Sequence, residues 1–147
     1  MRTVRDESGR RYLLVKESAE SSLVRDPETG AERHVPNADL ESVDGTSPLA
    51  TAATAVPDAV RTVVTAAHGD RALGLLVELD DRGPLAVEEL LDAYDLCESD
   101  LHGLLGEFRA AGLLTEATVH GRRGYDATEK ASEALAVLRA TDAGRAD

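Results

Sequence analysis

The first 45 residues consist of short apolar runs separated by turn-forming residues. Apolar side chains dominate residues 12–15 and 22–24, and residues 33–35, which include Val35, form a further candidate strand that ends at Pro36. Runs of this length, bounded by Gly, Pro, Asn or Asp, are typical of strands joined by tight turns. Residues 1–45 are therefore predicted to form a small antiparallel β-meander of three or four strands.

Residues 46–56 carry no charged side chain and are predicted to be a linker or the lead-in to a helix. From residue 57 onward, apolar residues recur at the three- and four-residue spacing of a helix. The first helical stripe comprises Val60, Val63, Val64 and Ala67. The second follows Asp70, a potential cap, and comprises Leu73, Leu76, Val77 and Leu79. Residues 142–147 are predicted to be a disordered tail.

Residues 85–136 combine both kinds of pattern. A short amphipathic helix begins after Pro84, and a second one ends at Gly112. Two β-prone segments, residues 115–119 and 125–128, then flank a hairpin loop at residues 120–124. A last helix is predicted to begin near Thr128. The chain is thus predicted to be α+β, with the β-meander followed by a domain at residues 57–141.

Residues 70–140 resemble the winged helix-turn-helix domain of prokaryotic transcription regulators. The resemblance rests on Gly112-Leu113-Leu114, where the Gly would end the second helix in a left-handed turn, and on the segment from Tyr125 to Lys130. Many members of that family carry Leu-Thr-Glu-Lys-Gly after the hairpin. This chain has Ala127 and Ala131 in place of the Leu and the Gly. The resemblance implies a winged helix-turn-helix fold for the C-terminal half.

In that family, the second helix of the motif enters the major groove and its N-terminal residues contact base edges. The resemblance gives this role to residues 98–109 and makes the hairpin the wing, which lies over phosphates or the minor groove. Guanidinium groups suit planar, bidentate phosphate contacts, so Arg122 and Arg123 are the strongest candidates at its tip. The candidate DNA-binding residues are Ser99, His102, Gly103, Gly106, Arg109, His120, Arg122 and Arg123.

Each candidate also has a plainer interpretation. Arg122 and Arg123 could be exposed charges in an ordinary hairpin turn. Gly103 and Gly106, which each cost about 1 kcal/mol in a helix relative to Ala, could let either DNA or another helix approach closely. The outward positions of residues 98–106 include no Arg or Asn for bidentate base contacts. The acidic residues there would repel phosphates, or simply stabilise the helix N-terminus.

The composition and net charge of the chain affect how it could bind DNA. The chain carries a net charge of −12, has Arg in place of most Lys, and contains no Trp. Together with abundant Ala, this composition is typical of a halophilic archaeon, in which acidity serves solubility in molar salt. Residues 57–141 contain 8 basic and 16 acidic residues, a net charge of −8. Binding by counterion release would weaken steeply in such salt. The hypothesis is therefore that DNA binding relies on shape, hydrogen bonds and bound cations, and it predicts weak salt dependence.

The alternative function is a winged-helix protein-interaction module, or adaptor, that does not bind DNA directly. An acidic motif helix suits that role. The expected partners are double-stranded DNA and a second copy of the chain, which would pair through the helices near residues 60–67 and 134–138. A protein partner could bind residues 1–45.

The sequence offers no catalytic, metal-binding or cofactor-binding pattern, and an enzyme is not expected. The four histidines lack metal-ligand spacing, and no phosphate-binding loop is present. Cys97 is alone, so it cannot form an intrachain disulfide. It is predicted to be a partly buried structural residue, with redox sensing as the alternative. The N-terminus does not resemble a signal peptide and no apolar run is long enough for a bilayer, so the protein is expected to be cytoplasmic.

Overall fold

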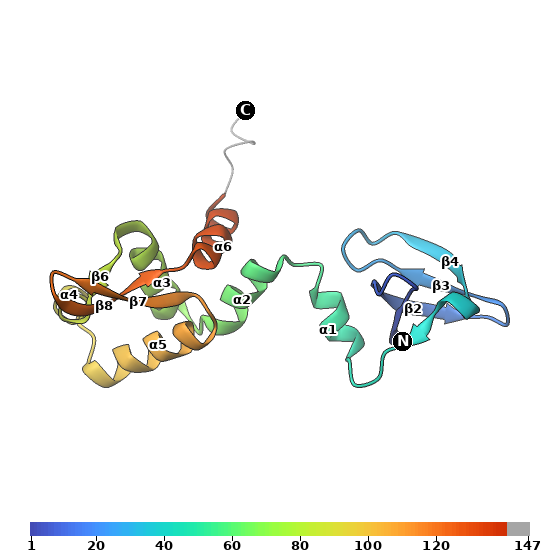
Figure 1. Cartoon of the computed structure of the whole chain (residues 1–147), viewed down its shortest axis with the longest axis horizontal. Coiled ribbons are helices and arrows are strands. Elements are labelled where there is room, and N and C mark those ends of the chain that lie inside the picture. Colours follow the sequence, from blue (N-terminus) through green and yellow to red (C-terminus); the bar gives the residue numbers. More distant parts are fainter. Residues whose placement is uncertain (141–147) are drawn as a thin grey trace, which may run out of the picture. The chain divides into compact units, whose positions relative to one another are not determined.

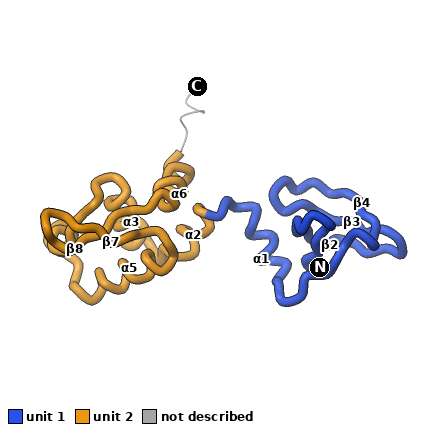
Figure 2. Tube along the Cα trace, in the orientation of Figure 1, with its two compact units in different colours: residues 1–58 blue, residues 59–147 orange. Residues whose placement is uncertain are grey.

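A computed structural model describes residues 1–140 of the chain, which divides into two compact units. Figure 2 colours the first unit, Met1–Asp58, blue and the second, Ala59–Asp147, orange. The predicted tail at residues 142–147 lies outside the described residues. The α+β class predicted from the sequence is confirmed, because strands fill the first unit and helices dominate the second (Figure 1).

The first unit is built on a five-stranded antiparallel sheet with the order β4-β3-β2-β1-β5. The first four strands form the predicted meander, and a short β5 returns to pair with β1. A 3-10 turn, η1, at Asn37–Asp39 connects the last two strands. The strands are β1 Arg2–Arg5, β2 Arg11–Glu17, β3 Ser21–Arg25, β4 Glu32–Pro36 and β5 Glu41–Ser42.

Helix α1, Pro48–Ala53, packs against β1 and β2 and belongs to the first unit. Ser47 caps it, accepting a hydrogen bond from the Leu49 amide. The buried hydroxyls of Thr3 and Thr51 lie 2.6 Å apart and join the sheet to the helix. Residues 46–56, predicted as a linker or a helix lead-in, therefore contain a helix that packs on the sheet. A small apolar core consists of Val4, Tyr12, Leu14, Val24 and Val35.

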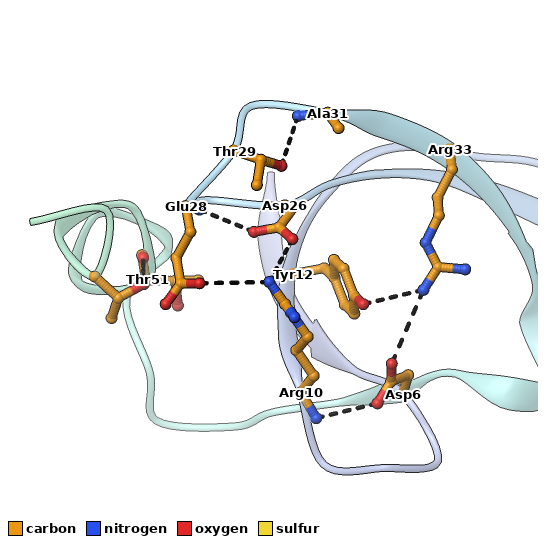
Figure 3. Close-up of polar contacts among 10 residues, drawn as sticks. Asp6, Arg10, Tyr12, Asp26, Glu28, Thr29, Ala31, Arg33 and Thr51 are labelled. Carbon is orange, nitrogen blue, oxygen red and sulfur yellow. Dashed lines mark hydrogen bonds and ion pairs between the residues drawn. The ribbon is translucent and has the colours of Figure 1, made fainter.

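Alternating charges surround Tyr12 (Figure 3). Arg33 donates to the Tyr12 hydroxyl at 3.0 Å and also lies 3.9 Å from Asp6. Arg10 pairs with Asp26 at 2.5 Å, and both guanidinium carbons lie within 6 Å of the tyrosine ring centroid, at 5.9 and 5.2 Å. Hydrogen bonding to Tyr12 raises the pKa of Arg33. These pairs hold neighbouring strands together on a sheet too small to bury much apolar surface.

As far as residue 140, the second unit contains five helices and a three-stranded sheet with the order β6-β8-β7. Both strand pairs are antiparallel. Its elements are α2 Asp58–Ala66, α3 Asp70–Arg82, β6 Leu85–Ala86, α4 Val87–Tyr94, α5 Glu98–Ala110, β7 Leu114–Val119, β8 Arg122–Ala127 and α6 Glu129–Arg139.

One continuous core joins these elements, and its largest fully buried side chains are Phe108, Leu76, Leu79, Leu90, Leu101, Leu105, Leu113 and Leu135. Leu73 was predicted to lie inside but is 37% exposed, and Val64 of the first apolar stripe is 61% exposed. Helix α3 instead turns Ala72, Leu75, Leu76 and Leu79 inward. Gly69, not Asp70, is its N-cap residue, so Asp70 occupies the first turn.

Within residues 1–140, no helix combines the length and the apolar character needed to cross a bilayer.

Candidate nucleic-acid interface

Helices α4 and α5 follow each other through a turn of three residues. Asp95 ends α4 in the left-handed conformation, with φ of 50°. The Cys97 sulfur accepts a hydrogen bond from the Asp100 amide, 3.4 Å away, and so caps α5. Cys97 is exposed, which corrects the prediction of a partly buried residue. Its structural role is to satisfy one of the unpaired amides at the helix start.

Helix α5 has one side buried in the core and one side exposed to solvent. Leu101, Leu105 and Phe108 enter the core. The exposed side carries four of the predicted site residues, namely Ser99, His102, Gly103 and Gly106. A Cβ added at either glycine would meet nothing within 4 Å. Within the described residues, therefore, no other helix packs on these glycines, and their helix-weakening effect is not offset by an internal contact.

The hairpin differs from its predicted form. Its turn comprises only His120 and Gly121, with φ of 50° and 76°. Positive φ at both central residues matches the twist of two antiparallel strands, so pairing continues up to the turn. Arg122 and Arg123 thus belong to β8, opposite Val119 and Thr118, and not to a loop. Adjacent strand residues point to opposite faces, so the two guanidinium groups leave the hairpin on different sides.

Each hairpin arginine meets a carboxylate. Arg122 forms an ion pair with Glu88 in the first turn of α4, at 2.5 Å. Arg123 lies 3.1 Å from Glu116 and donates to the Tyr125 hydroxyl at 2.9 Å. Interaction with Tyr125, and then with Glu116, raises the pKa of Arg123. All four charged side chains are largely exposed, so these pairs can exchange with other partners.

Arg109 connects the end of α5 to the hairpin. Its guanidinium lies 3.0 Å from Oε1 of Glu116, the same oxygen that Arg123 approaches. Two arginines therefore share one carboxylate, leaving a local excess of positive charge. The structure brings Arg109 and Arg123 together, whereas Arg122 pairs away from them with α4.

Sequence reasoning missed Arg71 and His68. These residues and the exposed side of α5, from Ser99 to Glu107, line a groove of about 370 Å³. Arg71 lies 3.9 Å from Asp100 and is 68% exposed. A basic residue at the start of α3 had no local signal in the sequence, because only the tertiary fold places it beside α5.

The described residues contain no group of three or more His, Cys, Asp or Glu side chains able to hold a metal ion. On α5, His102 lies 3.6 Å from Glu98, and these two side chains alone do not make a metal site. The arrangement can instead make hydrogen bonds and ion pairs, through exposed guanidinium groups beside a helix whose outer side includes two glycines.

A family model described as "Family of unknown function (DUF7346)" matches residues 1–139. No curated protein and no solved structure matches the chain.

Proposed function

We propose that the chain, which belongs to the DUF7346 family, is a DNA-binding transcription regulator with a winged helix-turn-helix. The order of elements from α3 to α6 supports this: a helix, a short strand, two helices, a hairpin and a final helix. The observation that carries the proposal is the convergence of Arg109 and Arg123 on Glu116, beside the glycine-lined side of α5.

In this proposal, α5 lies in the major groove, where the absence of side chains at Gly103 and Gly106 lets its backbone approach the bases. Ser99 and His102 contact base edges by hydrogen bonds. Arg122 and Arg123 of the hairpin, with His120 at the turn, contact the phosphate backbone. Phosphate oxygens take the place of the Glu88 and Glu116 carboxylates, which are exposed in the free protein.

Arg109 and Arg71 extend the phosphate contacts along both ends of α5. Arg109 lies at the end of the helix, and Arg71 lines the groove beside its start. Because the guanidinium groups leave their carboxylates, one of which Arg109 and Arg123 share, to meet phosphates, binding includes an exchange of ion partners. The salt dependence is therefore expected to be weaker than that of a basic protein with unpaired cations. Such binding suits the molar-salt cytoplasm that the composition indicates.

The proposed regulator is a homodimer, because apolar side chains remain exposed on α2, α3 and α6. Val64, Leu73 and Leu138 border a groove of about 260 Å³ and are 61%, 37% and 42% exposed. Val137, which precedes Leu138 in the sequence, is 57% exposed. Two-fold pairing through these helices buries this surface and presents two hairpins to one duplex.

A protein-interaction module is the second candidate function. It is favoured by the pairing of Arg122, Arg123 and Arg109 with carboxylates, because these ion pairs must open before the arginines can meet DNA. Glu98 and Asp100 in the first turn of α5 add negative charge beside the same surface. In this function, the exposed side of α5 receives a partner helix.

Chromatin immunoprecipitation in the native host, with an Arg122→Ala/Arg123→Ala variant, distinguishes the two functions. Arg2→Ala/Arg5→Ala is the matched control, because both of these arginines also lie on a strand and pair with exposed glutamates. Discrete promoter peaks that persist in the control and vanish in the hairpin variant support DNA binding. A flat profile from well-expressed wild-type protein overturns it.

A further inference from the structure

A cavity of about 250 Å³ lies between α3 and the turn that joins α4 to α5. Its walls are mostly apolar, with Leu75 from α3 and Leu96 from the turn among them. Engineered apolar cavities of roughly 150 Å³ hold benzene, so this space is sufficient for one aromatic ring with a short side chain. All of its residues belong to the second unit.

Gly74 forms part of the cavity wall although it lies in the middle of α3. A Cβ added there would meet nothing within 4 Å, and its backbone φ is not in the left-handed range. Neither crowding nor backbone conformation therefore requires glycine, which is among the weakest helix formers. The effect of glycine at this position is to leave the cavity open, because a larger side chain would enter it.

The polar groups in the wall are predominantly acidic. Asp70 and Glu78 contribute two carboxylates from α3, against one guanidinium, Arg71, which faces a third carboxylate at Asp100. Tyr94 adds an aromatic ring, and its hydroxyl accepts a hydrogen bond from Arg82 at 2.6 Å. Burial, followed by a hydrogen bond to Glu78, raises the pKa of Tyr94, so the phenol remains neutral.

We propose that this cavity binds a small organic cation, an ammonium group attached to an apolar body the size of one ring. The apolar body lies against Gly74, Leu75 and Leu96, and the ammonium group meets the carboxylate of Glu78 and the ring of Tyr94. Asp70, two turns earlier on α3, adds negative charge to the same cavity. Because the wall includes the α4–α5 turn, an occupied cavity restrains the start of α5. The site does not depend on DNA binding and can exist in either candidate function.

The test is titration of the full ¹⁵N-labelled chain with phenethylammonium chloride, followed by amide chemical shifts at constant KCl and neutral pH. The neutral isostere 2-phenylethanol is titrated in parallel. The expected result is saturable shifts at Gly74, Leu75 and Leu96, with the cation bound about tenfold more tightly than the alcohol. Equal affinity for both probes, or no saturable shift at these amides, overturns the proposal.

Two variants test the site itself. Gly74→Leu fills the cavity and is expected to weaken phenethylammonium binding at least tenfold, while Ala50→Leu, at an exposed helical position of the first unit, leaves that binding unchanged. Asp70→Asn/Glu78→Gln is expected to retain binding of the alcohol and abolish the preference for the cation. Wild-type affinity in Gly74→Leu, or an undiminished preference in the double variant, overturns the assignment.

Discussion

Arg109 of α5 and Arg123 of β8 lie 3.0 and 3.1 Å from the same carboxylate oxygen of Glu116. The two arginines are separated along the chain by the whole of β7 and the hairpin turn. Their meeting point ties the end of the helix to the hairpin and holds both guanidinium groups on one surface. Glu116 thereby positions two cations in the free protein and, in the proposed function, competes with phosphates for them.

This competition predicts that Glu116→Gln strengthens DNA binding. The amide keeps the size of the side chain but no longer attracts the two arginines. Affinity for a mixed-sequence duplex, measured by fluorescence anisotropy, is expected to rise severalfold. The free energy of unfolding is expected to change by less than about 1 kcal/mol, because the pairs are exposed. Glu133→Gln, the same charge change at an exposed position of α6, is the control; equal or weaker binding by Glu116→Gln would contradict the prediction.

Replacing the glycines of α5 by alanine is expected to have opposite effects on thermal stability and on DNA binding. Gly103→Ala and Gly106→Ala each place a methyl group in open space and improve the helix by about 1 kcal/mol. The midpoint of thermal unfolding is expected to rise by roughly 4–8 °C per substitution for a unit of this size. DNA affinity is expected to fall, since the added methyl groups separate the helix backbone from the bases. Circular dichroism and anisotropy check both effects, and a rise in both quantities would count against close approach of α5 to DNA.

The periodicity of apolar residues was sufficient to predict the strand-rich first unit and the order of the long helices. The two shortest strands, β5 and β6, were not predicted, because two residues carry no periodic pattern and pairing alone defines them. The buried side of α3 was also predicted one position away from the observed one. The reason is that apolar residues extend around more than half of this helix. Periodicity then leaves the choice of the inner side to the tertiary packing.

Gly124 explains why the hairpin arginines were assigned to a loop. A glycine after Arg122 and Arg123 is a turn signal in sequence, but this one lies inside β8. A Cβ at Gly124 would come within 2.4 Å of the Leu85 carbonyl oxygen. The glycine is thus required by the close approach of β6, a strand whose existence had no sequence signal. The candidate residues on α5 depended on helix geometry alone, so their positions could be predicted.

The exposed apolar groove predicts that a single charge disrupts the proposed dimer. Val64→Asp places a carboxylate among Val63, Leu73 and Leu138, and burying it there in a dimer carries a large desolvation penalty. Light scattering coupled to size exclusion is expected to show a dimer for the wild type and a monomer for the variant. Leu49→Asp, at an 81% exposed position of α1, is expected to leave the mass unchanged. A monomeric wild type would refute the dimer.

The hydrogen bonds of Asp6 predict that part of the stability of the first unit is lost at acid pH. The Ser8 hydroxyl lies 2.6 Å from its carboxylate, and the Ser8 and Arg10 amides donate to the same oxygen, both at 3.0 Å. These hydrogen bonds, that of the Ser8 hydroxyl foremost, lower the pKa of Asp6 from its ordinary value of 3.8. The ionised form is therefore favoured by folding. The contribution of Asp6 to stability is fully present above the pKa that it has in the unfolded chain. That contribution is lost as the pH falls through the lower pKa of the folded protein.

Asp6→Asn removes that pH dependence, so the wild type should exceed the variant in stability at neutral pH, by a margin that narrows below about pH 4. Urea unfolding followed through the amide signals of β2 measures the margin for the first unit alone. Ser8→Ala, which removes the hydroxyl donor while retaining the carboxylate and the amides, is expected to give a smaller effect with the same sign. A margin that stays constant or grows toward low pH would mean that the Asp6 carboxylate is not stabilised by folding.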